Sequence, residues 1–295
     1  MCANSNHHTF PRFIIIGYAN HDVNRFADGS EQFCVGGGGY FAALAASRIL
    51  PDVGLVTRVG EDFNLTPLAG RVVCDAVSVV PGGKTALSLQ TYHNPNDLTD
   101  RSIALEPGVN LGISASDVPE AWIARARMIL VSTMTPAQQR RVVEALVAKK
   151  RSEAITIGGV SPQLPIIAID SDLCWLNEEE SAREVRAMLR YADIAFMNRA
   201  EGEILKDLIP HIPIVILKRD AEGAELLARG VRQALVSAPQ VKVVDVTGAG
   251  DVVAGTFLAS LATNRSVEDA LVAAVNAASE SIAKEGIEHM LTPSA

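Results

Sequence analysis

The stretch VVDVTGAGDVVAGTFLASLA, residues 243–262, joins a turn of small residues to the start of an apolar helix. Residues 241–246 are rich in β-branched side chains and predict a short strand, whereas helical spacing begins near Asp251. A glycine-rich turn that leads into a helix presents backbone N–H groups and the positive end of the helix dipole, which suits a phosphate. Asp251 nevertheless places a negative charge at that position.

This aspartate fits a phosphoryl group that is being transferred rather than held at rest. In transfer to an alcohol, the protein stabilises charge on the phosphoryl oxygens while a base accepts the hydroxyl proton. The N–H groups of Ala249, Gly250 and Asp251 can serve the first purpose, and the carboxylate of Asp251 the second. The structural alternative is an aspartate in the first turn that only stabilises its helix, which is a common use of this residue.

Composition narrows the class of protein. The chain has 295 residues, of which 48% are hydrophobic, enough to bury a substantial core. Its 26 Lys and Arg residues against 34 Asp and Glu residues give a net charge of -8, and no basic block is present, so a nucleic-acid partner is not expected. The apolar runs are about six residues long, short of the roughly 20 that a membrane helix needs, so no membrane span is expected.

The N-terminal residues and the cysteines predict a compartment. The first 12 residues lack both a basic region and a long apolar stretch, so no secretory signal is indicated. The four cysteines, Cys2, Cys34, Cys74 and Cys174, show no metal-ligand spacing. We therefore expect no structural metal and a reducing, cytoplasmic location.

Apolar and β-branched segments alternate with helical patterns along the chain. Strands are predicted at 13–17, 53–59, 128–132, 154–157, 194–197 and 214–217, and helices at 40–49, 136–149, 178–191 and 199–208. This order is typical of a parallel sheet covered on both faces. Segments 29–35 and 85–105 instead indicate half-exposed antiparallel strands, and two helical patterns, 251–262 and 266–284, end the chain. We predict one domain over residues 1–295 with a small flap.

A dinucleotide-binding fold is the first alternative, because GAGDVVAG resembles part of its glycine fingerprint. That fold requires a second parallel strand after the helix, with an acidic residue near its end. Here another helical pattern follows instead. The earlier cluster that begins at Gly37 is followed by a strand, but no acidic residue ends that strand. The sequence therefore disfavours a dehydrogenase.

Five segments in order resemble the ribokinase-like PfkB family of carbohydrate and nucleoside kinases. DVTGAGD (245–251) is similar to its C-terminal signature D-T-x-G-A-G-D, and VGGGGYFAALAASRI (35–49) to its N-terminal di-glycine motif. VTRVGEDF, MNRAEGEIL with its N-x-x-E motif, and VILKRDAEGAELL resemble further family segments. The resemblance implies an α/β fold of three layers, in which a mostly parallel central sheet has helices on both faces and a small β lid covers the acceptor.

The resemblance also assigns roles near the glycine turn. It implies that Asp251 is the general base and that Gly248, Ala249 and Gly250 form an anion hole. Asp245 and Thr247 occupy positions that in many members help to hold a monovalent cation such as K⁺. Considered alone, these two residues would be turn formers.

The nucleotide side of the site is assigned in the same way. Asn198 and Glu201 lie at a strand-to-helix junction and could organise hydrated Mg²⁺ on the phosphates of ATP. The alternative is a helix cap with its capping-box partner. Lys218, Asp220, Gly223 and Asn276 are further residues that the resemblance places near the nucleotide, and Lys218 could meet phosphate directly.

On the acceptor side, Asp22 matches the acidic residue that binds acceptor hydroxyls, and Gly36 and Gly37 would let the backbone approach the acceptor. The sequence departs from the family at Phe41, where many sugar kinases have asparagine. One or both of Tyr40 and Phe41 either line the pocket or pack in the core. The family segment Asp-x-Asn-x-Arg after the middle strand is replaced by ITIGGVSPQ, and Thr256 stands where alanine or glycine is usual.

These residues predict an ATP-dependent kinase that transfers the γ-phosphoryl group to a hydroxyl of a small carbohydrate, polyol or nucleoside. ATP and Mg²⁺ are the expected cofactors, and a homodimer formed through the lid is a further expectation from the family. The alternative is a catalytically silent member that serves as a ligand-binding or scaffold protein. Retention of Asp251, the glycine turn and N-x-x-E argues against that alternative, because a scaffold needs none of them.

Overall fold

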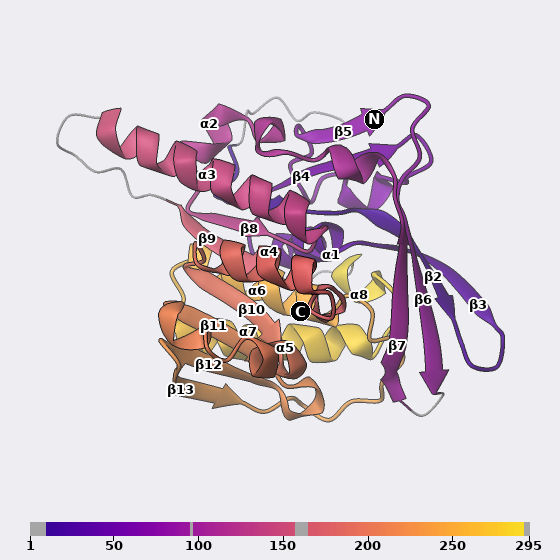
Figure 1. The fold of residues 1–295 in the computed structure, drawn as a ribbon. Coiled ribbons are helices and arrows are strands. Elements are labelled where there is room, and N and C mark those ends of the chain that lie inside the picture. Colours follow the sequence, from indigo (N-terminus) through magenta and orange to yellow (C-terminus); the bar gives the residue numbers. More distant parts are fainter. Residues whose placement is uncertain (1–9, 95–96, 157–164, 292–295) are drawn as a thin grey trace.

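A nine-stranded sheet forms the centre of the computed structural model, which describes residues 10–94, 97–156 and 165–291 (Figure 1). The strand order is β13-β12-β11-β10-β9-β8-β1-β4-β5. Neighbouring strands from β5 to β11 run parallel, and β12 and β13 are antiparallel additions at one edge. The bounds are β1 Phe13–Ile16, β4 Val53–Gly60, β5 Val77–Val80, β8 Met128–Val131, β9 Ile166–Asp170, β10 Ile194–Asn198, β11 Ile214–Lys218, β12 Ala224–Ala228 and β13 Val231–Val236.

Helices cover both faces of this sheet, which gives three layers. One face packs against α1 (Gly38–Ser47), α6 (Ala249–Ala262), α7 (Val267–Ile282) and α8 (Glu288–Leu291). The other face packs against α2 (Glu120–Ile123), α3 (Pro136–Thr156), α4 (Glu179–Leu189) and α5 (Arg199–Ile204). In β1, Phe13 and Ile15 enter the first core while Ile14 and Ile16 enter the second. A strand that is buried on both sides is apolar throughout, as the sequence analysis predicts.

A second, four-stranded sheet stands beside the first (Figure 1). Its order is β3 (Glu31–Gly36), β2 (Asn20–Arg25), β6 (Leu87–Asn94) and β7 (Asp97–Glu106). β2 pairs antiparallel with β3 and parallel with β6, and β6 pairs antiparallel with β7. β3, β6 and β7 fall largely within the predicted flap segments 29–35 and 85–105, of which residues 95–96 lie outside the described residues, whereas β2 was not predicted.

Two predicted strands are wrong. Residues 154–156 form the end of α3, residue 157 lies outside the described residues, and the strand that follows α3 is β9. A short apolar run cannot distinguish a strand from a continuing helix, and here the helix continues. Residues 241–246 form no strand, because the N–H groups of Val244 and Asp245 donate to the Ile282 carbonyl at the end of α7 rather than to a neighbouring strand.

The end of the chain and the character of the helices bear on the expectations about a dinucleotide-binding fold and a membrane span. The sequence after α6 continues directly into α7, and the described residues contain no strand after β13, so the second parallel strand of a dinucleotide-binding unit is missing there. Within the described residues, no helix combines the length and apolar character that crossing a membrane requires.

Candidate active site

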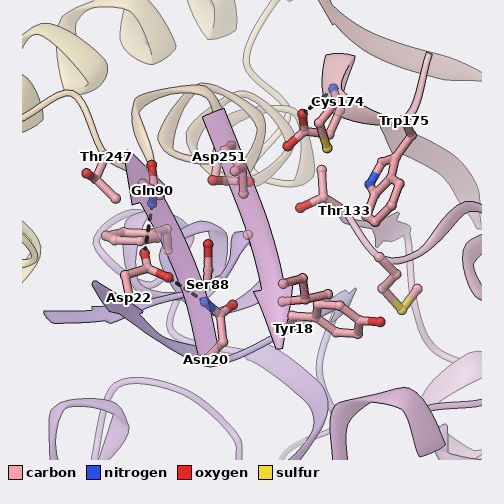
Figure 2. Close-up of a pocket in the computed structure, with 18 residues that line it drawn as sticks. Tyr18, Asn20, Asp22, Ser88, Gln90, Thr133, Cys174, Trp175, Thr247 and Asp251 are labelled. Atoms are coloured by element: carbon pink, nitrogen blue, oxygen red, sulfur yellow. Dashed lines mark hydrogen bonds between the residues drawn. The ribbon is translucent and has the colours of Figure 1, made fainter. Parts of the chain in front are cut away.

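A cavity of about 150 Å³ lies where the two sheets meet (Figure 2). Its walls come from the lid strands β2, β6 and β7, from the starts of α1 and α6, and from the segments that follow β1, β8 and β9. In parallel α/β sheets, ligands bind beyond the carboxyl ends of the strands. Six residues predicted for the site line this cavity: Asp22, Gly37, Phe41, Thr247, Gly248 and Asp251.

The N-terminus of α6 is shaped by Gly248. This residue has a left-handed backbone with φ of 73°, and a Cβ placed on it would lie 2.6 Å from the Phe41 ring. Glycine is therefore required both by the conformation and by the close approach of the ring. The N–H of Ala249 donates to the Val246 carbonyl at 3.3 Å. Of the three N–H groups expected to bind an anion, those of Gly250 and Asp251 are consequently the better candidates.

Asp251 lies in the first turn of α6 and borders the cavity. Burial raises the pKa of its carboxyl group to about 7, and the neighbouring carboxylate of Asp170 contributes to the same shift, while Lys218 opposes it. A carboxyl group with a pKa near neutrality is well matched to general-base catalysis, because it can both accept and release a proton at physiological pH.

Lys218 is held at the end of β11 by Asp170, whose Oδ1 accepts from Nζ at 3.0 Å. Desolvation would lower the pKa of Lys218, but the carboxylates of Asp170, Glu201 and Asp251 together raise it above its ordinary value. A Cβ placed on Gly250 would lie 3.0 Å from Nζ. The ammonium group therefore remains charged beside the N-terminus of α6, next to the N–H groups that are candidates for binding phosphate.

Asn198 and Glu201 form a capping box at the start of α5. Asn198 Oδ1 accepts from the Glu201 N–H at 2.8 Å, and Glu201 Oε2 accepts from the Asn198 N–H at 2.7 Å. Burial raises the pKa of Glu201 to about 8, opposed mainly by Lys218. The capping arrangement is thus present, while a role for Glu201 toward Mg²⁺ stays a prediction.

Asp22 lies at the lid side of the cavity within a polar cluster. Its Oδ1 accepts from Asn20 Nδ2, and its Oδ2 accepts from Gln90 Nε2 at 3.4 Å. A Cβ on Gly36 would collide with the Asp22 carboxylate, so glycine leaves the room that this carboxylate fills. Gly37 has φ of 101° and passes close to the Tyr18 carbonyl. Because neither glycine has a side chain, both leave space on the acceptor side of the cavity.

The remaining predicted residues lie away from the cavity. Asp245 accepts from the N–H groups of Thr247 at 2.9 Å and Gly286 at 3.0 Å, which is the role of a turn former. Asp220 and Gly223 form the turn between β11 and β12, and Asn276 is exposed on α7. Among the residues placed by the structure, no group of three or more His, Cys, Asp or Glu side chains is arranged to hold a metal ion. The monovalent cation stays a prediction.

Several lining residues were missed by the sequence analysis. They follow the carboxyl ends of strands or belong to the lid, and comprise Tyr18, Asn20, Gly38, Ser88, Gln90, Ile103, Leu105, Thr133, Met134, Asp172, Cys174 and Trp175. A correct position for β9 would have identified Asp172, Cys174 and Trp175, because residues that follow a parallel strand face the ligand edge. The misplaced strand also misplaced the family segment: Asp170-Ser171-Asp172-Leu173-Cys174 follows β9, with Asp172 for the asparagine and Cys174 for the arginine of that motif.

The three-layer arrangement with its separate lid sheet is the ribokinase-like fold, and solved structures share it. A nucleoside kinase of Burkholderia thailandensis in complex with inosine superposes with a TM-score of 0.76 at 16% identity, covering 95% of this chain and 93% of that chain. An E. coli protein assigned as a ribokinase II, with ATP and Mg²⁺ bound, gives a TM-score of 0.77 at 18% identity and covers 96% of each chain.

The family model for the pfkB family of carbohydrate kinases matches residues 12–294, and the chain belongs to this family. A cytidine kinase of Thermococcus kodakarensis is 26% identical over 290 residues, with 92% of this chain and 96% of that protein covered. A ribokinase of Lactococcus lactis is 26% identical over 269 residues, covering 88% of this chain and 83% of that protein. The chain is therefore a phosphotransferase of a family whose members act on sugars or nucleosides.

Proposed function

We propose that the protein transfers the γ-phosphoryl group of ATP to a hydroxyl of a small carbohydrate, polyol or nucleoside. The observation that carries the proposal is the position of Asp251, which lies at the N-terminus of α6 and borders the same cavity as Asp22. Asp251 has a pKa near neutrality and lies next to helix N–H groups, and Asp22 is a second carboxylate that can bind hydroxyls. This combination supports phosphoryl transfer to an alcohol. The comparisons give no support to a catalytically silent member.

The proposed reaction balances within this site. Asp251 accepts the proton of the acceptor hydroxyl, the acceptor oxygen forms a bond to the γ-phosphorus, and the bond from that phosphorus to the β,γ-bridging oxygen breaks to release ADP. The N–H groups of Gly250 and Asp251, together with the Lys218 ammonium, face the growing negative charge. Asp22 orients the acceptor through hydroxyls that do not react.

Mg²⁺ fits the residues on the nucleotide side. This ion prefers oxygen ligands and keeps several waters, so it needs few direct protein ligands when ATP phosphates are bound. Glu201 and Asp170 provide carboxylate oxygens near Lys218, and Glu201 is the residue that we assign to its hydration shell. When bound, the ion would neutralise charge on the phosphates.

A coupled ADP-release screen over sugars, polyols and nucleosides, with MgATP in excess, tests the proposed function. We expect at least one class of hydroxyl acceptor to accelerate ADP release well above the hydrolysis of ATP alone. If ATP binds but no acceptor in the three classes raises ADP release, the assignment is wrong.

The pH dependence of the reaction provides a prediction for Asp251. The base must be unprotonated, so kcat/KM for the acceptor should fall as the pH is lowered through about 7, the pKa of Asp251. An unperturbed aspartate would place this fall about three pH units lower. An initial-rate series from pH 5 to 9 checks it, and a constant kcat/KM between pH 5 and 7 would contradict the role.

Substitution of Glu201 separates a cap from a magnesium role. Glu201→Gln preserves an oxygen that can accept from the Asn198 N–H, as capping boxes allow, but it removes the carboxylate. We expect the Mg²⁺ concentration for half-maximal activity to rise several-fold, with a smaller change in the acceptor KM. A magnesium titration that matches the wild type would leave Glu201 as a cap only.

The four-stranded sheet is proposed as a lid over the acceptor, because β2, β6 and β7 contribute Asp22, Gln90 and Leu105 to the cavity. Amide hydrogens in residues 29–35 and 85–105 should exchange more slowly when the acceptor is bound. Hydrogen exchange measured by mass spectrometry checks this, and exchange that is equal with and without the acceptor in both segments would argue against closure.

The homodimer through this sheet stays a prediction, for which the exposed Phe33 on β3 is the residue to substitute.

A further inference from the structure

The charge of the acceptor cavity restricts what it can bind. Three carboxylates line it, those of Asp22, Asp172 and Asp251, and none of the described lining residues is lysine, arginine or histidine. A phosphate or carboxylate on the acceptor would enter a partly buried site without an opposite charge, which carries a large desolvation cost. The cavity therefore favours an acceptor that is neutral and rich in hydrogen-bond donors.

Among the three lining carboxylates, Lys218 offsets the negative charge at Asp251, whose pKa burial raises and Lys218 lowers. It is paired with Asp170, and its ammonium group lies next to Gly250 rather than among the lining side chains. In the proposed kinase, the Lys218 ammonium group therefore binds the phosphates of ATP. The acceptor side retains an excess of negative charge, in contrast to what a sugar phosphate or a sugar acid would require.

The cavity has two chemically different ends (Figure 2). Asp22 and its hydrogen-bonded neighbours form the polar end. Tyr18 and Trp175 lie on the other side and contribute two aromatic rings (Figure 2), and the Met134 thioether also lines the cavity. The Tyr18 hydroxyl donates to Gln138 Oε1 at 2.6 Å, which fixes its ring against the cavity. Aromatic and thioether walls favour a flat ring system whose faces can stack on them, whereas a simple sugar would leave much of this surface without a partner.

Asp172, which is hydrogen-bonded to Cys174, adds a specific feature to the cavity wall. Its Oδ1 accepts from the Cys174 N–H at 3.0 Å, and the Cys174 thiol is a further hydrogen-bonding neighbour of this half-buried carboxylate, which also borders the cavity. An ionised carboxylate can only accept hydrogen bonds, so Asp172 favours an N–H group on the part of the ligand that it faces. A ligand that places a carbonyl against this carboxylate is disfavoured, because neither group can donate a hydrogen bond, and this difference discriminates between ligands.

From these features we infer that the acceptor is an uncharged nucleoside whose base carries an exocyclic amino group, as adenosine and cytidine do. The inference rests on the proposed kinase function. The ribose hydroxyls meet Asp22, the base lies against Tyr18, Met134 and Trp175, and the amino group donates to Asp172.

The test compares adenosine, cytidine, inosine, uridine, ribose and ribose 1-phosphate in the ADP-release assay, and measures binding of each by calorimetry without ATP. We expect kcat/KM for adenosine or cytidine to exceed that for inosine and uridine at least about tenfold, which corresponds to about 1.4 kcal/mol. Ribose and ribose 1-phosphate should be poorer still. Binding affinities should follow the same order.

The variant Asp172→Asn tests directly whether Asp172 recognises the base. The amide oxygen can still accept from the Cys174 N–H, so the local turn is preserved, but the group that faces the ligand becomes an N–H donor. We expect the preference to move toward inosine or uridine, whose bases present a carbonyl at the corresponding position. Asp75→Asn, on an exposed turn, should retain the wild-type order.

The outcomes separate the two claims. If ribose or ribose 1-phosphate is the best acceptor, the inference on substrate class is wrong while the kinase function stands. If adenosine or cytidine binds best but releases no ADP, the kinase function is wrong while the binding preference stands. If Asp172→Asn leaves the order of nucleosides unchanged, Asp172 does not read the base and the inference is overturned.

Discussion

Asp251→Asn is expected to lower kcat about 10²–10⁴-fold, the usual range for loss of a general base. The asparagine amide has nearly the shape of the carboxylate but cannot accept the proton of the acceptor hydroxyl. Affinity for ATP should change little, because the N–H groups at the start of α6 and the Lys218 ammonium remain in place. Steady-state kinetics together with calorimetric titration of ATP measure both quantities.

The same variant should not lose stability. The pKa of Asp251 is about 7 in the folded protein and near 3.9 in an unfolded chain, so its ionisation disfavours folding increasingly as the pH rises from about 4 to about 7. Above pH 7 that cost is fully present in the wild type and absent from the asparagine variant. The Tm of Asp251→Asn at pH 8 should therefore equal or exceed that of the wild type.

Asp75→Asn serves as the matched control, since it removes a carboxylate from an exposed turn. It should leave both kcat and Tm within the ordinary range for surface substitutions. Near-normal turnover of Asp251→Asn would remove the catalytic role from this residue. A large fall in its Tm would show instead that the carboxylate is structural.

The sequence predicted most of the central sheet because its signals are local. Buried parallel strands such as β1 and β8 are continuous apolar runs, and the glycine turn before α6 indicates a left-handed backbone at Gly248. These features depend on few distant contacts. The positions of Gly248 and Asp251 beside the cavity could therefore be expected from the motif itself.

The lid strand β2 was missed for a physical reason. Three of its four buried positions are occupied by Asn20, Asp22 and Asn24, whereas the pattern that predicts a half-buried strand places apolar residues there. Asn20 donates to Asp22 and both line the cavity, while Asn24 donates to the Cys34 Sγ on β3, and this environment arises only when β2 pairs with β3 and β6. A functional strand thus lacked the sequence signal of an ordinary strand.

Asp170 and Asp172 were missed because β9 was placed too early. The apolar residues near 154–157 continue a helix of 21 residues, and the choice between helix and strand depended on contacts that a local pattern does not contain. A single misplaced strand removed the ion-pair partner of Lys218 and one carboxylate of the cavity from the prediction. Sites built at the ends of strands are sensitive to such errors.

Phe41→Asn is expected to have the second largest effect, and it acts on both stability and binding. The side chain is 2% exposed and belongs to the core formed by α1 and α6, yet it also borders the cavity. The two roles that the sequence left open are thus both compatible with its position. Removal of a buried phenylalanine costs about 3–5 kcal/mol, and an unpaired buried amide adds to that cost.

The Phe41 ring also supports the turn before α6. It packs against Gly248, where no larger side chain could fit, so its loss should loosen the turn that presents the N–H groups of Gly250 and Asp251. We therefore expect Phe41→Asn to lower the Tm by about 2–4 °C for each kcal/mol lost, and to lower kcat as well as raise the acceptor KM. Thermal denaturation and steady-state kinetics on the same preparation measure these changes.

Phe41→Leu distinguishes the core role from the ligand contact. Leucine fills much of the same apolar volume, so this variant should retain most of the Tm that Phe41→Asn loses. It lacks the aromatic face, whose stacking on a planar ligand is worth about 0.5–1.5 kcal/mol beyond burial, so the acceptor KM should rise by roughly two- to tenfold. If Phe41→Leu keeps the wild-type KM while Phe41→Asn unfolds readily, the ring stabilises the start of α6 without contacting the acceptor, and selectivity for a flat base must then come from Tyr18 and Trp175 alone.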